Sequence, residues 1–270
     1  MASTNKKLIA EAPGINRKRI YYKSKLSIKD EGVKDEINEV HLIHPAYGHK
    51  RLSMHLNYGR NKILRIMKKF GIKPPRRKIK GKWITVSTDN HNYTNLIKDV
   101  VPEKPFQVFV SDLTYMKYQS KQYYLATVED IFTREIMSAE VSDKHDSQLS
   151  FSTIKKAVDK NKPEFFHSDQ GTEFMAQIVT NFLTGNNIKI SVSDKGSPWQ
   201  NGYKESFFDK FKVEIGDTER FETLGELVEE IYSYIYYYNN LRIHTKLKMP
   251  PAIFKQKFLD EDSVSHKMGT

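Results

Sequence analysis

Three carboxylate residues, Asp112, Asp169 and Glu205, have the types and the spacing of a site that could act on phosphodiesters. Asp112 lies in the strand-like run QVFVSDLTYMKY, Asp169 ends the apolar run EFFHSD, and Glu205 lies in the helix-like segment NGYKESFFDKFKVE. There are 56 residues between the first two acids and 35 between the second and the third. Two strand ends and a helix can bring such carboxylates together to bind a pair of magnesium ions. The pair would clamp the attacking and leaving oxygens of an in-line phosphoryl displacement.

The neighbours of Asp112 indicate that its charge needs a partner. It is the only acid in its strand-like run, and strand alternation places it on the same face as Val108 and Val110. The opposite face would carry three other large side chains, which are Phe109, Leu113 and Tyr115. The partner of a charge on this apolar face could be a metal ion or a nearby lysine or arginine, and both interpretations stay open.

The other two acids also have a functional and a structural interpretation. Asp169 is followed by Gln170 and Gly171, a turn that could open the site to a substrate, but an acid here can also cap the turn. Lys212 follows Glu205 by seven residues, about two helical turns, so both project from one helix face. A cation beside a metal site would suit a DNA phosphate, whereas the alternative is a solvated helix face.

The elements that would carry these acids predict a ribonuclease-H-like α/β fold, with a mixed five-stranded sheet flanked by helices. Three strand-like runs with short connections, at 107–118, 122–132 and 134–142, predict an antiparallel meander. The remaining elements are a helix at 146–161, a strand at 164–169, a helix at 172–186, a strand at 188–193, the helix with Glu205 and a last helix at 223–240.

The N-terminal third predicts a small helical module. Apolar periodicity indicates helices at 31–44, 49–57 and 60–70, and a turn at Tyr58-Gly59 joins the last two. Two short helices joined in this way suggest a helix-turn-helix that presents its second helix to a DNA groove. The alternative is a helical bundle with a charged solvent face. The basic residues expected to contact DNA are Arg60, Lys62, Arg65, Lys68 and Lys69 in this module and Arg76, Arg77 and Lys78 in the linker after it.

The charge of the chain, a net +11, is unevenly distributed. Residues 1–82 hold 22 Lys and Arg against 6 Asp and Glu, whereas residues 83–270 hold 22 against 27. Such a concentration of positive charge is typical of a nucleic-acid-binding module. The chain has no cysteine, which excludes disulfides and thiolate metal sites. It has no run of 18 apolar residues and no signal-peptide core, so we expect a soluble cytoplasmic protein without a membrane segment.

Several residues near these motifs have a second interpretation. His167, two residues before Asp169, could be an extra ligand or a proton carrier, although a packing role at the strand end is favoured. Another five residues are candidates for contacts with a DNA end, the aromatic ones by stacking on bases. For the aromatic and basic members, a packing or surface role is an equal alternative. These five candidates are Trp199, Asn201, Tyr203, Arg242 and His244.

The motifs SDLTYM, FFHSDQGTEF and GSPWQNGYKESFFDKFK resemble the three catalytic motifs of DDE transposases in the retroviral-integrase superfamily. More narrowly, the chain resembles the second-frame protein of a widespread family of bacterial insertion sequences, in which 35 residues also separate the last two acids. HPAYGHKRLSMHLN and RNKILRIMKKFGI resemble that family's helix-turn-helix, GINRKRIYYKSK its opening segment, and LRIHTKLKMPPAIF its end motif. The resemblance covers about residues 14–254. The chain departs from it with Phe109 in place of a frequent tryptophan, and with Gln200-Asn201-Gly202 in place of Asp-Asn-Ala.

The resemblance implies that Asp112, Asp169 and Glu205 bind two Mg²⁺ ions, with Mn²⁺ as a substitute, and that Lys212 contacts DNA. The site would first cut one strand at the end of the element with water, and the freed 3′-OH would then attack another phosphodiester. The implied partners are double-stranded DNA, as terminal inverted repeats and target, and further copies of the chain. In many relatives an upstream-frame protein is fused to this one. The implied location is the bacterial cytoplasm, in association with the nucleoid.

The predicted organisation has five parts. They are a basic segment at 1–28, the helix-turn-helix module at 29–73, a basic linker at 74–104, the integrase-type catalytic core at 105–258 and a loose tail at 259–270. Two other functional classes stay open alongside the transposase. One is a ribonuclease-H-like nuclease that cuts without joining, and the other is a non-catalytic DNA-binding regulator of transposition.

Overall fold

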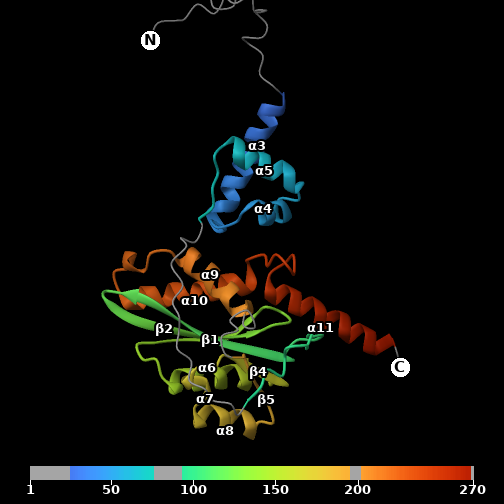
Figure 1. Ribbon diagram of the computed structural model, residues 1–270. Helices are drawn as coiled ribbons and strands as arrows, with labels where there is room; N and C mark the ends of the chain where they lie inside the picture. The colour runs from blue at the N-terminus through green and yellow to red at the C-terminus, as the bar shows by residue number, and fades with distance from the viewer. Residues whose placement is uncertain (1–24, 76–92, 195–201, 269–270) are drawn as a thin grey trace, which may run out of the picture. The chain divides into compact units, whose positions relative to one another are not determined.

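The structure, a computed structural model, describes residues 25–75, 93–194 and 202–268, and within the last range it leaves out the side chains of 202–205 and 264–268. The chain divides into two compact units, Met1–Pro74 and Pro75–Thr270, here called unit 1 and unit 2 (Figure 1). The division falls at the start of the segment predicted to be a linker.

Unit 1 contains three described helices, α3 (Lys25–Ile43), α4 (His49–His55) and α5 (Arg60–Lys69). Their buried apolar side chains recur at helical spacing and form the small core: Val33, Ile37, Val40, Leu52, Ile63, Ile66 and Met67. The predicted helices at 49–57 and 60–70 are confirmed, and the turn between them contains Asn57 with a positive φ of 52°. Helix α3 begins six residues before the predicted start, and this added part includes Asp30, a buried acid that binds α5.

Unit 2 is built on a five-stranded mixed sheet in the order β3-β2-β1-β4-β5 (Figure 1). Its strands are β1 (Val108–Tyr118), β2 (Lys121–Asp130), β3 (Ile136–Ser142), β4 (Phe165–Ser168) and β5 (Lys189–Val192). The first three form an antiparallel meander, whereas β4 pairs in parallel with β1 and β5 in parallel with β4. This is the ribonuclease-H-like architecture predicted from the order of the elements.

Helices cover both faces of the sheet and enclose two apolar clusters (Figure 1). The helices of one face are α6 (Ser147–Lys160), α7 (Thr172–Met175) and α8 (Gln177–Gly185); those of the other are α9 (Gly202–Ile215) and α10 (Leu224–Asn240). Strand β1 contributes to both clusters, because Phe109 belongs to the first, whereas Met116 and Tyr118 belong to the second. The alternation of β1 therefore fixes the two layers that flank the candidate site.

The segment 172–186, predicted as one helix, is two helices separated at Ala176, whose backbone is extended. Ile178 is exposed, whereas Phe174 and Val179 are buried in the same cluster. Phe174 lies on the short helix before the break and Val179 on the helix after it. The break at Ala176 allows both side chains to reach the core.

The predicted tail at 259–270 is wrong for most of its length, because α11 runs from Pro251 to Met268. Two aromatic contacts anchor the start of this helix: the ring centroids of Phe254 and Phe258 lie 5.5 and 4.9 Å from that of Phe132. The sequence between Ala252 and Met268 contains no glycine or proline, which allows the helix to continue beyond these contacts.

Part of the predicted linker at 74–104 belongs to the fold of unit 2. Ile97 is buried in a cluster with Val108, Val110 and Ile131. The backbone N–H of Val192, in β5, donates a hydrogen bond to the carbonyl of Thr94 at 3.1 Å. Within the described ranges of both units, no helix combines the length and apolar character needed to cross a membrane.

Candidate active site

Asp112 and Asp169 both lie just beyond the paired part of β1 and β4. The two strands pair from Val108–Phe165 to Val110–His167, and the same register continued by two residues sets Asp112 opposite Asp169. Neighbouring strands are about 4.8 Å apart. Strand β4 ends at Ser168, whereas β1 continues to Tyr118 with β2 as its partner. Each aspartate therefore follows the last β1–β4 pair by two residues, Asp112 on the strand that continues and Asp169 on the turn after β4.

The two aspartates differ in their surroundings. Asp112 is half-buried, and its Oδ1 accepts a hydrogen bond from the backbone N–H of Leu113 at 2.8 Å. Asp169 is exposed, and its Oδ1 accepts one from the backbone N–H of Gly171 at 3.0 Å. Desolvation by the surrounding protein is the largest cause of a raised pKa of Asp169, although the Gly171 N–H opposes it. A divalent cation would offset this desolvation, so the donor set suits a hard metal ion.

The helix that carries Glu205 is fixed against β1 and α10 by its apolar side. Four buried side chains of α9, which are Phe207, Phe208, Phe211 and Ile215, belong to the cluster with Met116 of β1. A fully buried side chain of this size contributes about 1.5–3 kcal/mol. The ammonium of Lys212 lies 5.0 Å from the ring centroid of Tyr115, on β1. Positions 205 and 212 share a helix face by spacing, so this contact turns that face toward the strand of Asp112.

The third acid, Glu205, lies on α9, but its side chain is outside the described part of the chain. Among the side chains that are described, no three His, Cys, Asp or Glu residues group closely enough to hold a metal ion. The candidate DNA-end residues Trp199 and Asn201, and the side chain of Tyr203, also lie outside the described part, as do Arg76, Arg77 and Lys78.

Arg242 has a structural role, and the predicted contact with DNA is wrong for this side chain. Its side chain is 1% exposed, and its Nε donates hydrogen bonds to both carboxylate oxygens of Glu214 at 3.0 Å. Burial alone would lower the pKa of Arg242, but the hydrogen bonds to Glu214 raise it overall, so the guanidinium stays charged. The pair ties the end of α10 to the last turn of α9 and so helps to orient the helix of Glu205.

His244 stays a predicted DNA contact. It is half-buried after α10, and its backbone N–H donates a hydrogen bond to the carbonyl of Met249 at 3.0 Å.

His167 is buried and has the packing role that was favoured. Its Nδ1 and Nε2 lie 2.9 Å from the hydroxyl oxygens of Ser191 and Ser193, respectively. Burial lowers its pKa to about 4, so the imidazole is neutral at neutral pH. These hydrogen bonds join β4 to β5 just before Asp169 and leave no lone pair directed toward the aspartate.

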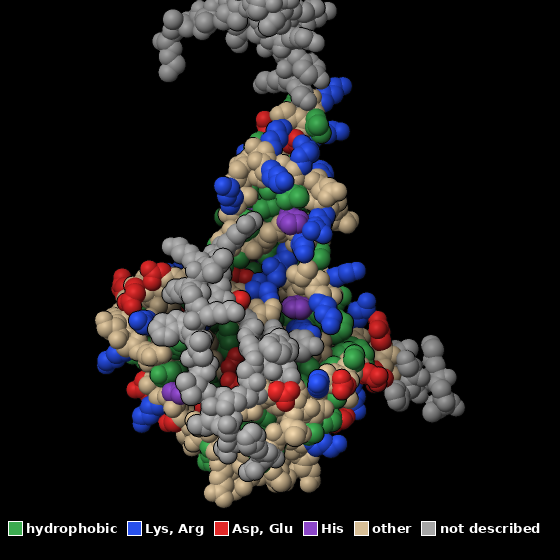
Figure 2. Space-filling model, viewed as in Figure 1, with side chains coloured by type: hydrophobic (Ala, Val, Ile, Leu, Met, Phe, Trp, Pro, Cys, Tyr) green, Lys and Arg blue, Asp and Glu red, His purple; other side chains and the backbone are tan. Residues whose placement is uncertain are grey.

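The basic residues of unit 1 divide into two groups. Arg60 and Lys68 are exposed, and lysine and arginine side chains are prominent over the visible face of this unit (Figure 2). Arg65 and Lys69 instead hold the buried carboxylate of Asp30: Arg65 donates two hydrogen bonds at 2.7 and 2.6 Å, and Lys69 donates one at 2.9 Å. The ammonium of the fifth predicted contact, Lys62, lies 3.5 Å from the ring centroid of Tyr58. Contacts of these residues with DNA remain predictions.

Two residues near Asp169 were missed at the level of sequence. Glu173 affects the pKa of Asp169 by raising it, and His145, whose Nε2 lies 3.2 Å from Oε1 of Glu173, lowers it. Glu173 could have been found, because it follows Asp169 by four residues in the same motif. His145 lies in a loop between β3 and α6, and nothing in its local sequence indicates that it approaches Asp169.

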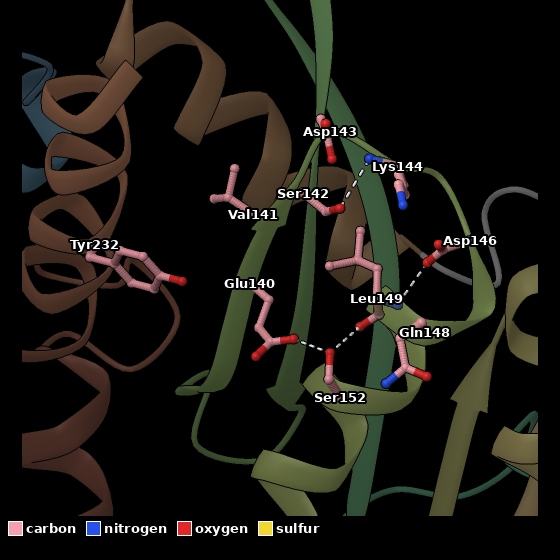
Figure 3. A pocket seen from close by; sticks show the side chains of 10 residues that line it. All are labelled: Glu140, Val141, Ser142, Asp143, Lys144, Asp146, Gln148, Leu149, Ser152 and Tyr232. Carbon is pink, nitrogen blue, oxygen red and sulfur yellow. Dashed lines mark hydrogen bonds between the residues drawn. The ribbon is translucent and has the colours of Figure 1, made fainter. Parts of the chain in front are cut away.

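A separate hollow lies between the end of β3 and the start of α6, with a volume of about 440 Å³ (Figure 3). Acidic side chains and Tyr232 are prominent in its lining, and the hydroxyl of Ser152 hydrogen-bonds Glu140 there. Oδ1 of Asp146 accepts a hydrogen bond from the backbone N–H of Leu149 at 3.0 Å and so caps α6. Neither Asp112 nor Asp169 lines this hollow, so it is distinct from the candidate active site.

Comparison with known proteins places this fold and site in a family. Residues 102–198 and 186–251 each match an integrase core domain. An uncharacterized 31 kDa protein of insertion element IS600 from Shigella sonnei is 31% identical over 85% of this chain and 89% of its own length. The chain belongs to the insertion-sequence transposases of the retroviral-integrase superfamily. This transposase is also 27% identical, over 89% of each chain, to the putative transposase InsK of insertion sequence element IS150 from Escherichia coli (strain K12).

Among solved structures, the catalytic core of the HTLV-2 integrase in complex with magnesium is similar, with a TM-score of 0.44 and 21% identity. The match covers 56% of the transposase and 97% of that chain.

Proposed function

We propose that this transposase cuts one DNA strand at the end of its insertion sequence and joins the freed 3′-OH to another phosphodiester. Asp112, Asp169 and Glu205 would act as ligands of two Mg²⁺ or Mn²⁺ ions. The observation that carries the proposal is the register of β1 and β4: continued by two residues beyond the pair Val110–His167, it would set Asp112 opposite Asp169. The family supports the class of reaction, which is polynucleotidyl transfer.

The chemistry of the donors fits such ions. Carboxylate oxygens are hard ligands, and two or three of them suffice for magnesium, which keeps several of its waters. When bound, two such ions would supply Lewis-acid activation and charge neutralisation for the in-line displacement. Asp112 would provide a fixed ligand, because β1 is paired with β2 at this point, where Asp112 lies opposite Thr127. Asp169 would provide a ligand on a turn, where a small movement can adapt the site to substrate.

Other residues would hold the DNA. Lys212 lies on β1's side of α9 and would contact a phosphate close to the acids. Unit 1, with its exposed Arg60 and Lys68, would bind duplex DNA of the terminal repeats or of the target. Because strand transfer joins two ends, we expect at least two copies of the chain to assemble on DNA, alone or fused to an upstream-frame protein.

The test uses labelled DNA that carries the ends of the element encoding this chain, incubated with the full-length protein and Mg²⁺. We expect 3′-end nicks followed by joined strands, with both products lost in Asp112→Asn and Asp169→Asn. Asp159→Asn is a matched control, because Asp159 is an exposed acid of α6 in an ion pair with Lys155. Full activity in Asp112→Asn would contradict the proposal.

The products also distinguish the transposase from the two other functional classes, a nuclease that only cuts and a non-catalytic regulator. Nicks without joined strands would identify a nuclease that only cuts. DNA binding that survives Asp169→Asn, with no metal-dependent product from the unaltered protein, would identify a non-catalytic regulator.

A further inference from the structure

The carboxylate of Glu173 is folded back onto the turn that carries Asp169. Its side chain is only 11% exposed, although the preceding residue, Thr172, is exposed. A Cβ atom at position 171 would lie 2.6–2.9 Å from the carboxylate atoms of Glu173, so a side chain there would displace this carboxylate. Phe174, which is buried in the core, fixes the backbone on the other side of Glu173. Glu173 is thus held close against the turn instead of extending into solvent.

His145 holds Glu173 in this position from a different part of the chain. Its Nε2 lies 3.2 Å from Oε1 of Glu173. The imidazole also packs on Tyr124 of β2, with 4.9 Å between the ring centroids. The next residue, Asp146, caps α6 through a hydrogen bond from the N–H of Leu149. His145 therefore connects the sheet and the start of α6 to the carboxylate of Glu173.

The turn between Asp169 and Glu173 is itself closely tied together. The N–H of Gly171 donates to Asp169, and the carbonyl of Gly171 accepts hydrogen bonds from the N–H groups of Phe174 and Met175 at 3.0 and 3.1 Å. Gly171 is therefore the link between the aspartate and α7. A change in the position of Glu173, which lies directly against Gly171, would be transmitted to Asp169.

We propose that Glu173 and His145 form a positioning pair, which keeps Asp169 oriented for binding a divalent cation. This inference rests on the proposed function, because it assumes that Asp169 is a metal ligand. Residues that orient a ligand from behind typically change metal affinity about 10–100-fold when they are replaced.

The pair is tested by measuring Mn²⁺ binding to the full-length protein without DNA, from the decrease of the free Mn²⁺ signal in electron paramagnetic resonance. We expect Glu173→Gln and His145→Gln each to weaken binding about tenfold. Their double variant should be no weaker than the weaker single variant, because both remove the same contact. Unchanged binding in the single variants, or losses that multiply in the double variant, would overturn the pair.

A second variant disturbs the pair without removing a charge. Gly171→Ala adds a methyl group where the Glu173 carboxylate lies, so we expect it to weaken Mn²⁺ binding to a similar extent. Gly185→Ala is the matched control: no other atom lies within 4 Å of the added Cβ there, and binding should not change. Parent-like binding in Gly171→Ala would also overturn the proposal. Thermal unfolding of each variant shows whether the protein is folded.

Asp169→Asn separates this inference from the proposed function. If it abolishes Mn²⁺ binding and the pair variants do not change it, the metal site stands and only the positioning pair is wrong. If the unaltered protein binds no Mn²⁺, or if Asp169→Asn binds it equally well, both proposals are overturned.

Discussion

Unit 1 contains a buried acid, Asp30, whose basic partners are exposed. Unit 2 contains an ion pair, Arg242 and Glu214, in which both partners are buried. The side chain of Asp30 is 1% exposed, while its partners Arg65 and Lys69 are 46% and 37% exposed. The side chains of Arg242 and Glu214 are 1% and 8% exposed. A basic residue in unit 1 can therefore hold the fold and still present a face to a phosphate. In unit 2 the corresponding arginine is committed to the fold.

Asp30 also makes the stability of unit 1 depend on pH, because its pKa differs between the folded and the unfolded state. Hydrogen bonds from Arg65, and then from Lys69, hold the pKa of Asp30 well below its usual range. A lowered pKa in the folded state gives stability that is fully present above the unfolded pKa, about 3.9, and is lost as the pH falls below it. Unit 1 should thus keep its ionic contact throughout the neutral range.

The largest effect expected from this comparison is a loss of stability of unit 2 when Arg242 is replaced. Arg242→Met leaves Glu214 buried without its partner, and removing one member of a buried pair costs about 3–5 kcal/mol. We expect calorimetry to show a lower unfolding temperature of unit 2, together with reduced DNA cleavage, because α9 loses its connection to the end of α10.

Arg220→Met is the control for this variant. Arg220 and Glu230 form an ion pair in the same unit, with side chains 51% and 44% exposed, and such exposed pairs contribute at most about 1 kcal/mol. Equal effects of the two substitutions would show that burial does not distinguish them, and the comparison between the units would fail.

The next effect concerns a second buried base of unit 2, His167. Its pKa is lowered to about 4 in the folded protein, against 6.5 for a free histidine. The unfolded state therefore binds more protons between these values, so the stability of unit 2 should decrease as the pH falls through this window. The full difference corresponds to about 3 kcal/mol, because one pKa unit equals about 1.4 kcal/mol.

The measurement is the unfolding temperature of unit 2 at several pH values, in the unaltered protein and in His167→Gln. Glutamine does not titrate, so the variant should show a smaller decrease between pH 6.5 and 4. Identical pH profiles would mean that His167 is not the group responsible.

Most of the fold could be predicted from sequence because strand alternation and helix periodicity are local. The meander, the two parallel strands and the helices at 146–161 and 223–240 follow from such patterns, and the structure contains them. The break at Ala176 could not be predicted, because no glycine or proline marks it and because Phe174 and Val179 pack in a cluster with residues from distant segments. Helix α11 was missed for a similar reason: its anchor, Phe132, is more than a hundred residues away in the sequence.

The candidate site was predictable to the extent that its residues lie in motifs. Asp112 and Asp169 stand out by type and spacing, and both follow the paired part of β1 and β4 by two residues. Arg242 was assigned to DNA because a sequence shows a charge but not its burial, and its partner Glu214 lies 28 residues earlier. His145 was missed because its contact with Glu173 joins the loop after β3 to α7, which lies further along the chain. The sequence alone was insufficient to predict these contacts, because each joins residues that are distant along the chain.

The smallest effect tests whether the exposed and the paired cations of unit 1 bind DNA in the same way. Arg60→Gln should reduce the slope of log affinity against log salt by about 0.9, the value for one lost phosphate contact, without changing the unfolding temperature of unit 1. Arg65→Gln should reduce the slope equally and also lower that temperature, because Asp30 loses its bidentate partner. Lys104→Gln, an exposed lysine of unit 2 paired with Glu164, is the control and should leave both quantities unchanged. If Arg65→Gln lowers the unfolding temperature but not the slope, Arg65 is committed to the fold as fully as Arg242. The difference between the units would then lie only in which partner is buried, and DNA binding by α5 would rest on exposed residues such as Arg60 and Lys68.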